Sequence, residues 1–138
     1  MSIDFAGFSG ETLQGALAEV LDRVRAGQLA SKRIAIRVMV SDMGVPMAIP
    51  AGADTASDDP TVRERAERIT SRSLDAIVDQ VHELGELGLV ESATVQARVH
   101  SASPLLKLYI INDSEVFFGF YPGHRTNGGV QGRAAGHL

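Results

Sequence analysis

A helical pattern of roughly 25 residues, starting at Asp59-Pro60 and ending near Gly85 or Gly88, constrains this chain more than any other feature. Asp59 can cap the first turn, and proline is favoured at the first helical position. A helix of that length spans about 38 Å, whereas a globule of 138 residues has a radius of gyration of about 14 Å. The helix must therefore cross the whole domain or overhang it, and an overhanging apolar stripe would need a partner. The apolar positions of the pattern are Val62, Ala66, Ile69, Leu74, Ile77, Val78, Val81 and Leu84.

The chain is long enough for one compact domain and too short for two ordinary ones. Its 138 residues are 44% hydrophobic and include no cysteine, so an apolar core must hold the fold without disulfides or Cys-bound metals. The first residues lack the basic and apolar runs of a signal peptide, and no stretch approaches the roughly 18 apolar residues of a membrane span. We therefore expect a cytoplasmic protein with no membrane contact. The net charge of −4 argues against direct nucleic-acid contact from this chain.

A second amphipathic helix is predicted from Ser9, which can cap its start, to Gly27, which suits a left-handed end. Residues 33–40 then alternate apolar side chains with a period of two and predict a strand. Residues 43–59, rich in glycine, proline and aspartate, predict a long irregular connection. The apolar face of the helix that starts at Ser9 is expected to consist of Leu13, Leu17, Val20, Leu21 and Val24.

Three further strands are predicted at about residues 93–100, 105–111 and 116–121. The turn chemistry of Asn112-Asp113-Ser114-Glu115 makes the last two a β-hairpin. Residues 123–138 are Gly-rich with almost no large apolar side chain and predict a flexible tail, so the domain is expected to occupy residues 1–122. The expected fold is α/β, with a small mixed or mostly antiparallel sheet that ends in a β-hairpin and is flanked by two helices.

The hairpin segment resembles the motif of the phospholipase D superfamily, which reads His-x-Lys, four residues, Asp, six residues, Gly-Ser on a strand-turn-strand unit. Lys107 and Gly119 fall in register with that motif. Leu105 stands at the histidine position, Asn112 at the aspartate position and Phe120 at the serine position. The family's histidine is the nucleophile that attacks phosphorus, so the resemblance implies a non-catalytic relative.

The resemblance extends over residues 29–122 and implies a phospholipase D-like half-domain. The phrases RIAIRVMVSDMGVPMAIP and PLLKLYIINDSEVFFGFYP are also similar to the region that follows the winged-helix segment in some bacterial regulators of the GntR type. Single-motif chains of the phospholipase D family pair about a two-fold axis across the motif strands. A homodimer is therefore the state that the resemblance implies, and it would also supply a partner for an overhanging helix.

Candidate binding residues lie on the strand that carries Lys107. Both faces of that strand are largely apolar, so the lysine either meets an anion or extends its tip to an edge. The first alternative predicts a small anionic ligand held near Lys107, Tyr109 and Asn112. The second alternative leaves Lys107 with no ligand.

Two more residues are candidates because they follow or end predicted strands. Asp42 lies among Met39, Met43 and Met47, where flexible thioethers suit an adaptable pocket or merely fill an irregular core edge. His100 ends the preceding strand and either replaces the missing nucleophile or simply terminates the strand. No metal or other cofactor is expected.

The sequence leaves three classes of function. The leading hypothesis is a non-catalytic ligand-sensing or dimerisation domain of the bacterial transcriptional regulator type. The second is a phosphodiesterase or nuclease with His100 as a displaced nucleophile. The third is a pure protein-interaction module with an apolar face at the hairpin.

Overall fold

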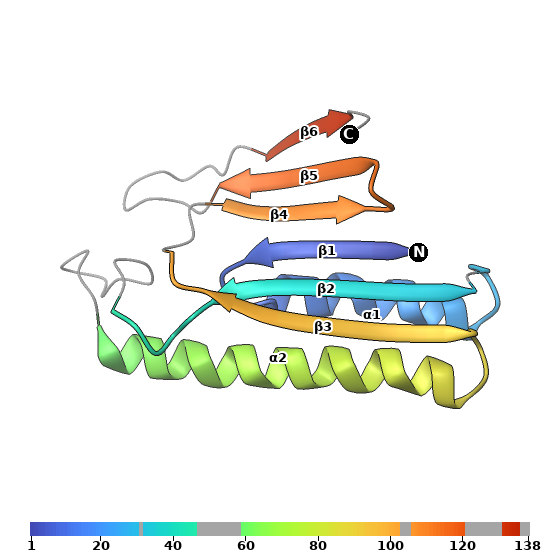
Figure 1. Ribbon diagram of the computed structural model, residues 1–138, viewed down its shortest axis with the longest axis horizontal. Coiled ribbons are helices and arrows are strands. Elements are labelled where there is room, and N and C mark those ends of the chain that lie inside the picture. Colours follow the sequence, from blue (N-terminus) through green and yellow to red (C-terminus); the bar gives the residue numbers. More distant parts are fainter. Residues whose placement is uncertain (31, 47–58, 103–105, 121–130, 136–138) are drawn as a thin grey trace.

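The computed structural model describes residues 1–30, 32–46, 59–102, 106–120 and 131–135. Among these residues the chain forms a six-stranded mixed sheet in the order β3-β2-β1-β4-β5-β6 with two helices (Figure 1). The elements are β1 (Ser2–Gly7), α1 (Glu11–Arg25), β2 (Arg33–Ser41), α2 (Pro60–Glu86), β3 (Ser92–His100), β4 (Leu106–Ile111), β5 (Glu115–Phe120) and β6 (Gln131–Ala135). The α/β class and the C-terminal hairpin expected from the sequence are confirmed.

The sheet has a parallel half and an antiparallel half. Strands β1, β2 and β3 are parallel and are joined through α1 and α2, while β4, β5 and β6 add to β1 as antiparallel neighbours. The connections from β1 to β2 and from β2 to β3 run in the same direction across the sheet. Because such crossover connections have the same handedness, both helices lie on one face of the sheet. Figure 1 shows α1 and α2 behind and below β1–β3. No helix of the described residues lies on the opposite face of the sheet.

The core lies between the two helices and the parallel half of the sheet. The inward residues of β1 and β2 alternate with outward ones, as expected for strands with one covered face. Leu21 of α1 and Ile77 of α2 have no exposed surface. The main core consists of Ile3, Phe5, Leu13, Leu17, Leu21, Val24, Ile34, Ile36, Val38, Val40, Ile77, Val81, Leu84 and Val90.

Helix α2 begins where the sequence predicted and crosses the domain. The Asp59 carboxylate accepts hydrogen bonds from the backbone N–H groups of Thr61 and Val62, at 2.9 and 3.4 Å. Beyond the main core, Ala66 packs with Met43 in a second buried cluster to which Phe8 and Val45 also contribute. The first turns of α2 therefore have a partner within the chain, supplied by the loops after β1 and β2.

Two strands were not anticipated from the sequence. Strand β1 carries only two large apolar side chains, Ile3 and Phe5, which is too short a pattern to stand out. Strand β6 lies inside residues 123–138, where a flexible tail was expected, and its sequence QGRAA has little β propensity. It is placed by backbone pairing with β5, so the expectation of a tail is wrong for residues 131–135. The remaining tail residues lie outside the described residues.

Candidate functional site

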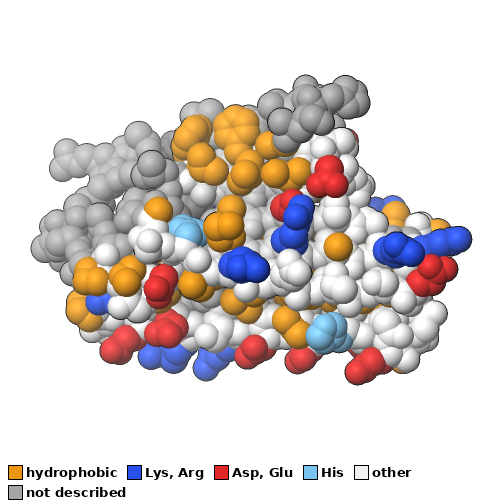
Figure 2. Space-filling view, viewed as in Figure 1, with side chains coloured by type: hydrophobic (Ala, Val, Ile, Leu, Met, Phe, Trp, Pro, Cys, Tyr) orange, Lys and Arg blue, Asp and Glu red, His pale blue; other side chains and the backbone are white. Residues whose placement is uncertain are grey.

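The face of the sheet opposite the helices carries an apolar patch on β4 and β5. The register pairs Leu108 with Phe118, and Leu108 lies beside Ala6 on the outward side of β1. Figure 2 shows apolar side chains gathered over β4 and β5, with charged side chains over the parallel strands. We define the apolar patch by the outward residues of the hairpin, which are Leu106, Leu108, Ile110, Val116, Phe118 and Phe120.

The apolar patch is unusual because its side chains remain accessible. Phe120 is 50% exposed and Leu106 is 38% exposed, although both belong to the middle strands of the sheet. The rings of Phe118 and Phe120 meet edge to face with their centroids 6.0 Å apart. Contiguous exposed apolar surface of this kind marks interaction sites more often than scattered apolar residues do.

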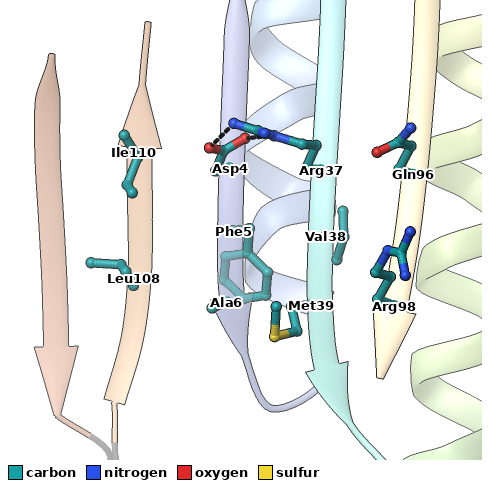
Figure 3. A pocket seen from close by; sticks show the side chains of 10 residues that line it. All are labelled: Asp4, Phe5, Ala6, Arg37, Val38, Met39, Gln96, Arg98, Leu108 and Ile110. Carbon is teal, nitrogen blue, oxygen red and sulfur yellow. Dashed lines mark hydrogen bonds and ion pairs between the residues drawn. The ribbon is translucent and has the colours of Figure 1, made fainter. Parts of the chain in front are cut away.

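A hollow of about 300 Å³ adjoins the apolar patch on the same face. Side chains from β1, β2, β3 and β4 surround it, and Figure 3 shows how they lie. The side toward β4 is apolar, and the side toward β3 is polar. The lining residues are Asp4, Phe5, Ala6, Arg37, Val38, Met39, Gln96, Arg98, Leu108 and Ile110.

An ion pair between neighbouring strands forms part of the hollow. Arg37 on β2 donates from Nε and Nη2 to the two carboxylate oxygens of Asp4 on β1, at 2.6 and 2.5 Å. Asp4 raises the pKa of Arg37. The larger effect comes from the side-chain hydrogen bonding, and the smaller one comes from the negative charge of the carboxylate. Figure 3 shows the guanidinium turned toward Asp4. The Arg37 guanidinium is thus largely paired with the Asp4 carboxylate of the same chain.

Arg98 on β3 is the second cation of the hollow. It is exposed, and within the part of the chain that the structure describes no carboxylate forms an ion pair with it. Gln96 lies on the same strand two residues earlier and places an amide on the same face. Met39, which is 43% exposed, lies in register with Arg98 on the neighbouring strand. The hollow therefore combines an available guanidinium with apolar walls.

Lys107 and Tyr109 point to the helix side of the sheet, away from the hollow. Tyr109 lies opposite Phe5 in the β1–β4 ladder, and the two rings are 5.0 Å apart and tilted by 58°. Tyr109 thus packs against the main core. Lys107 is half-buried and lies opposite Gly119 in the β4–β5 ladder.

Asn112 lies at the other end of β4 from Lys107. It accepts a hydrogen bond from Ser2 N–H at 3.0 Å through its side chain, and its own N–H donates to Ser2 O at 2.9 Å. Both Asn112 and Asp113 have positive φ, 52° and 55°, in the three-residue turn that joins Ile111 of β4 to Glu115 of β5. The structure gives Asn112 a role in closing the hairpin and separates it from Lys107.

Asp42 and His100 lie together at the carboxyl ends of β2 and β3. The backbone N–H of Asp42 donates to the carbonyl of His100 at 2.8 Å, and the Asp42 carboxylate accepts from Gly44 N–H at 2.8 Å. Two strands, β2 and β1, separate His100 from Lys107, which corresponds to about 14 Å across the sheet. The two side chains also start from opposite faces, so one chain does not bring His100 and Lys107 to one phosphodiester.

The five predicted site residues are therefore not gathered into one site. Met43 is buried in the second cluster, whereas Met39 lines the hollow; Met47 and Leu105 lie outside the described residues. Sequence reasoning missed Asp4, Arg37 and Arg98 as site residues. The outward arginine in the alternating pattern of residues 33–40 was an available signal, but its partner strand β1 was not recognised.

Comparisons with protein-family models, curated proteins and solved structures find no match for this chain. The phospholipase D-like resemblance thus remains a hypothesis that rests on Lys107, Gly119 and the similar phrases around them. Neither α1 nor α2, the helices of the described residues, is both long and apolar enough to cross a membrane. Within those same residues no group of three or more histidine, aspartate or glutamate side chains is placed to hold a metal ion.

Proposed function

We propose that this chain is a non-catalytic dimerisation and ligand-sensing domain of the bacterial transcriptional regulator type, in which two copies pair through the open face of the sheet. The observation that supports the proposal is the exposure of the apolar patch. Its side chains Phe120 and Leu106 are accessible to water although they belong to inner strands of the sheet. Pairing with a second copy removes this surface from water, which is favourable in proportion to the apolar area buried.

A second copy fits the open face for two reasons. All six side chains of the apolar patch are uncharged, so a two-fold axis through it brings no like charges together. Six strands about 4.8 Å apart and about 20 Å long have a flat area of roughly 600 Å², and the side chains that project from the sheet add to this area. A standard interface buries about 800 Å² on each partner, so the area of the open face is of the same order as that of a standard interface.

The non-catalytic part of the proposal rests on the motif positions. A leucine at position 105 supplies no nucleophile, and His100 is too far from Lys107 in the same chain to replace it. Lys107 instead lies against Gly119, with its stem covering the glycine. The assignment to a transcriptional regulator rests on the similarity to the region that follows the winged helix in regulators of the GntR type.

Sedimentation equilibrium of the purified chain tests the pairing. We expect the wild-type protein to be a dimer and Phe120→Glu to be a monomer with an unchanged far-UV circular dichroism spectrum. Leu87→Glu is the matched control, because Leu87 is 60% exposed but caps the end of α2, outside the apolar patch. A monomeric wild-type protein, or a Phe120→Glu protein that pairs like the wild type, would contradict the proposal.

A further inference from the structure

We propose that the hollow on the open face binds a small amphipathic monocarboxylate, with Arg98 holding the carboxylate and the β4 side of the hollow receiving the apolar body. The inference deepens the ligand-sensing part of the proposed function and rests on it. It does not require the pairing of two chains, because all the lining residues belong to one chain.

The charges around the hollow select a single negative charge. Asp4 and Arg37 neutralise each other through two hydrogen bonds, so Arg98 leaves one positive charge in excess. An arginine fork matches the planar geometry of a carboxylate and donates two parallel hydrogen bonds to it. A dianion such as a phosphate monoester would leave one negative charge uncompensated close to the Asp4 carboxylate.

The remaining walls select an apolar body. Leu108 and Ile110 line the hollow from β4, and Met39 lies on β2, between β4 and the strand of Arg98. Figure 3 shows Leu108 and Ile110 on β4, next to the strand of Asp4, and Met39 on the same strand as Arg37. A thioether adapts to ligands of different shape. The volume of about 300 Å³ lies at the lower end of the range for small-molecule sites and excludes large cofactors.

The hollow shares two side chains with the apolar patch. Leu108 and Ile110 belong to both, so a second copy seated on the apolar patch would lie over one rim of the hollow. A ligand that adds contacts to the paired form stabilises that form by mass action. Ligand binding and pairing are thus expected to be coupled, because both involve Leu108 and Ile110.

Titration of ¹⁵N-labelled protein with sodium octanoate, followed by amide chemical shifts, tests the inference. We expect saturable shifts centred on the lining residues of β1–β4 and at least tenfold weaker binding of octan-1-ol, which lacks the charge that Arg98 recognises. Arg98→Gln should lower the affinity for octanoate about tenfold and remove the preference over octan-1-ol. Arg65→Gln, a change at an exposed arginine of α2, is the matched control and should bind like the wild type.

Three results would overturn the inference: equal affinity for octanoate and octan-1-ol, unchanged octanoate binding by Arg98→Gln, or shifts centred away from the hollow. Repeating the titration with Phe120→Glu separates this inference from the pairing. Octanoate binding by a monomeric Phe120→Glu protein supports the hollow as a site of one chain. If the wild type proves monomeric and still prefers octanoate through Arg98, the pairing fails while the carboxylate site stands.

Discussion

Lys107 and Gly119 face each other across the β4–β5 ladder, and the lysine stem lies over the glycine. A Cβ atom added to Gly119 would lie 3.2 Å from Lys107 Cε and 3.7 Å from its Cγ. These are the two residues whose spacing resembles that of the phospholipase D motif. This packing explains on structural grounds why position 119 is a glycine, because a larger side chain would have to displace the lysine.

A double-mutant cycle measures this packing. In the wild-type background, Gly119→Ala gains strand propensity of about 0.5–1 kcal/mol but must push Lys107 aside, so we expect little net change in the free energy of unfolding. In a Lys107→Ala background the obstacle is gone, and Gly119→Ala should stabilise by the full amount. Urea unfolding of the four proteins gives the coupling, and a coupling of zero would show that the stem does not rest on the glycine.

The hairpin turn gives a second prediction. Asn112→Ala should destabilise the protein by about 1–2 kcal/mol, because alanine is strained at positive φ and the bond to Ser2 N–H is lost. Asp113→Gly should stabilise by about 0.5–1 kcal/mol, since glycine adopts the φ of 55° without strain. Thermal unfolding of both variants checks the signs. If Asn112→Ala left stability unchanged, the turn would not need the asparagine.

The sequence predicted best where local chemistry decides the structure. The start of α2 followed from Asp59 and Pro60, and the β4–β5 hairpin followed from its turn residues, all of which act on neighbours in the chain. The candidate site could not be predicted in this way, because Asp4, Arg37 and Arg98 come from three strands that meet only after the sheet is assembled. Because β1 was not predicted, the expected site included neither the acidic residue of that strand nor the strand next to which β4 lies.

Two glycines in and before α1 should respond oppositely to alanine. Gly15 is an exposed helical residue whose added Cβ would meet nothing within 4 Å, so Gly15→Ala should stabilise the protein by about 1 kcal/mol. Gly10 caps the helix with φ 73°, so Gly10→Ala should cost about 1–2 kcal/mol although its Cβ would make only ordinary contacts at 3.8 Å. Chemical denaturation of the pair checks this contrast, and equal effects would contradict it.

The cap of α2 can be isolated by two substitutions at one position. Asp59→Ala removes the acceptor for Thr61 N–H and Val62 N–H and should cost about 1 kcal/mol of unfolding free energy. Asp59→Asn keeps an acceptor oxygen and should cost only a few tenths. A loss of the same size in both variants would mean that the negative charge at the helix end, rather than the hydrogen bonds, gives the stabilisation.

The Asp4–Arg37 pair sets the charge of the hollow, so removing the acid should change what the hollow binds. Asp4→Asn frees the Arg37 guanidinium and adds one positive charge beside Arg98. A unit charge about 8 Å away in water is worth a roughly two- to threefold gain in affinity for octanoate, and a dianion such as octyl phosphate should gain more. Asp79→Asn is the control, because it makes the same change of charge at an exposed residue of α2, on the helix side of the sheet and away from the hollow. The gain should shrink as salt is added, and weaker octanoate binding by Asp4→Asn would show that the hollow does not recognise the carboxylate by charge.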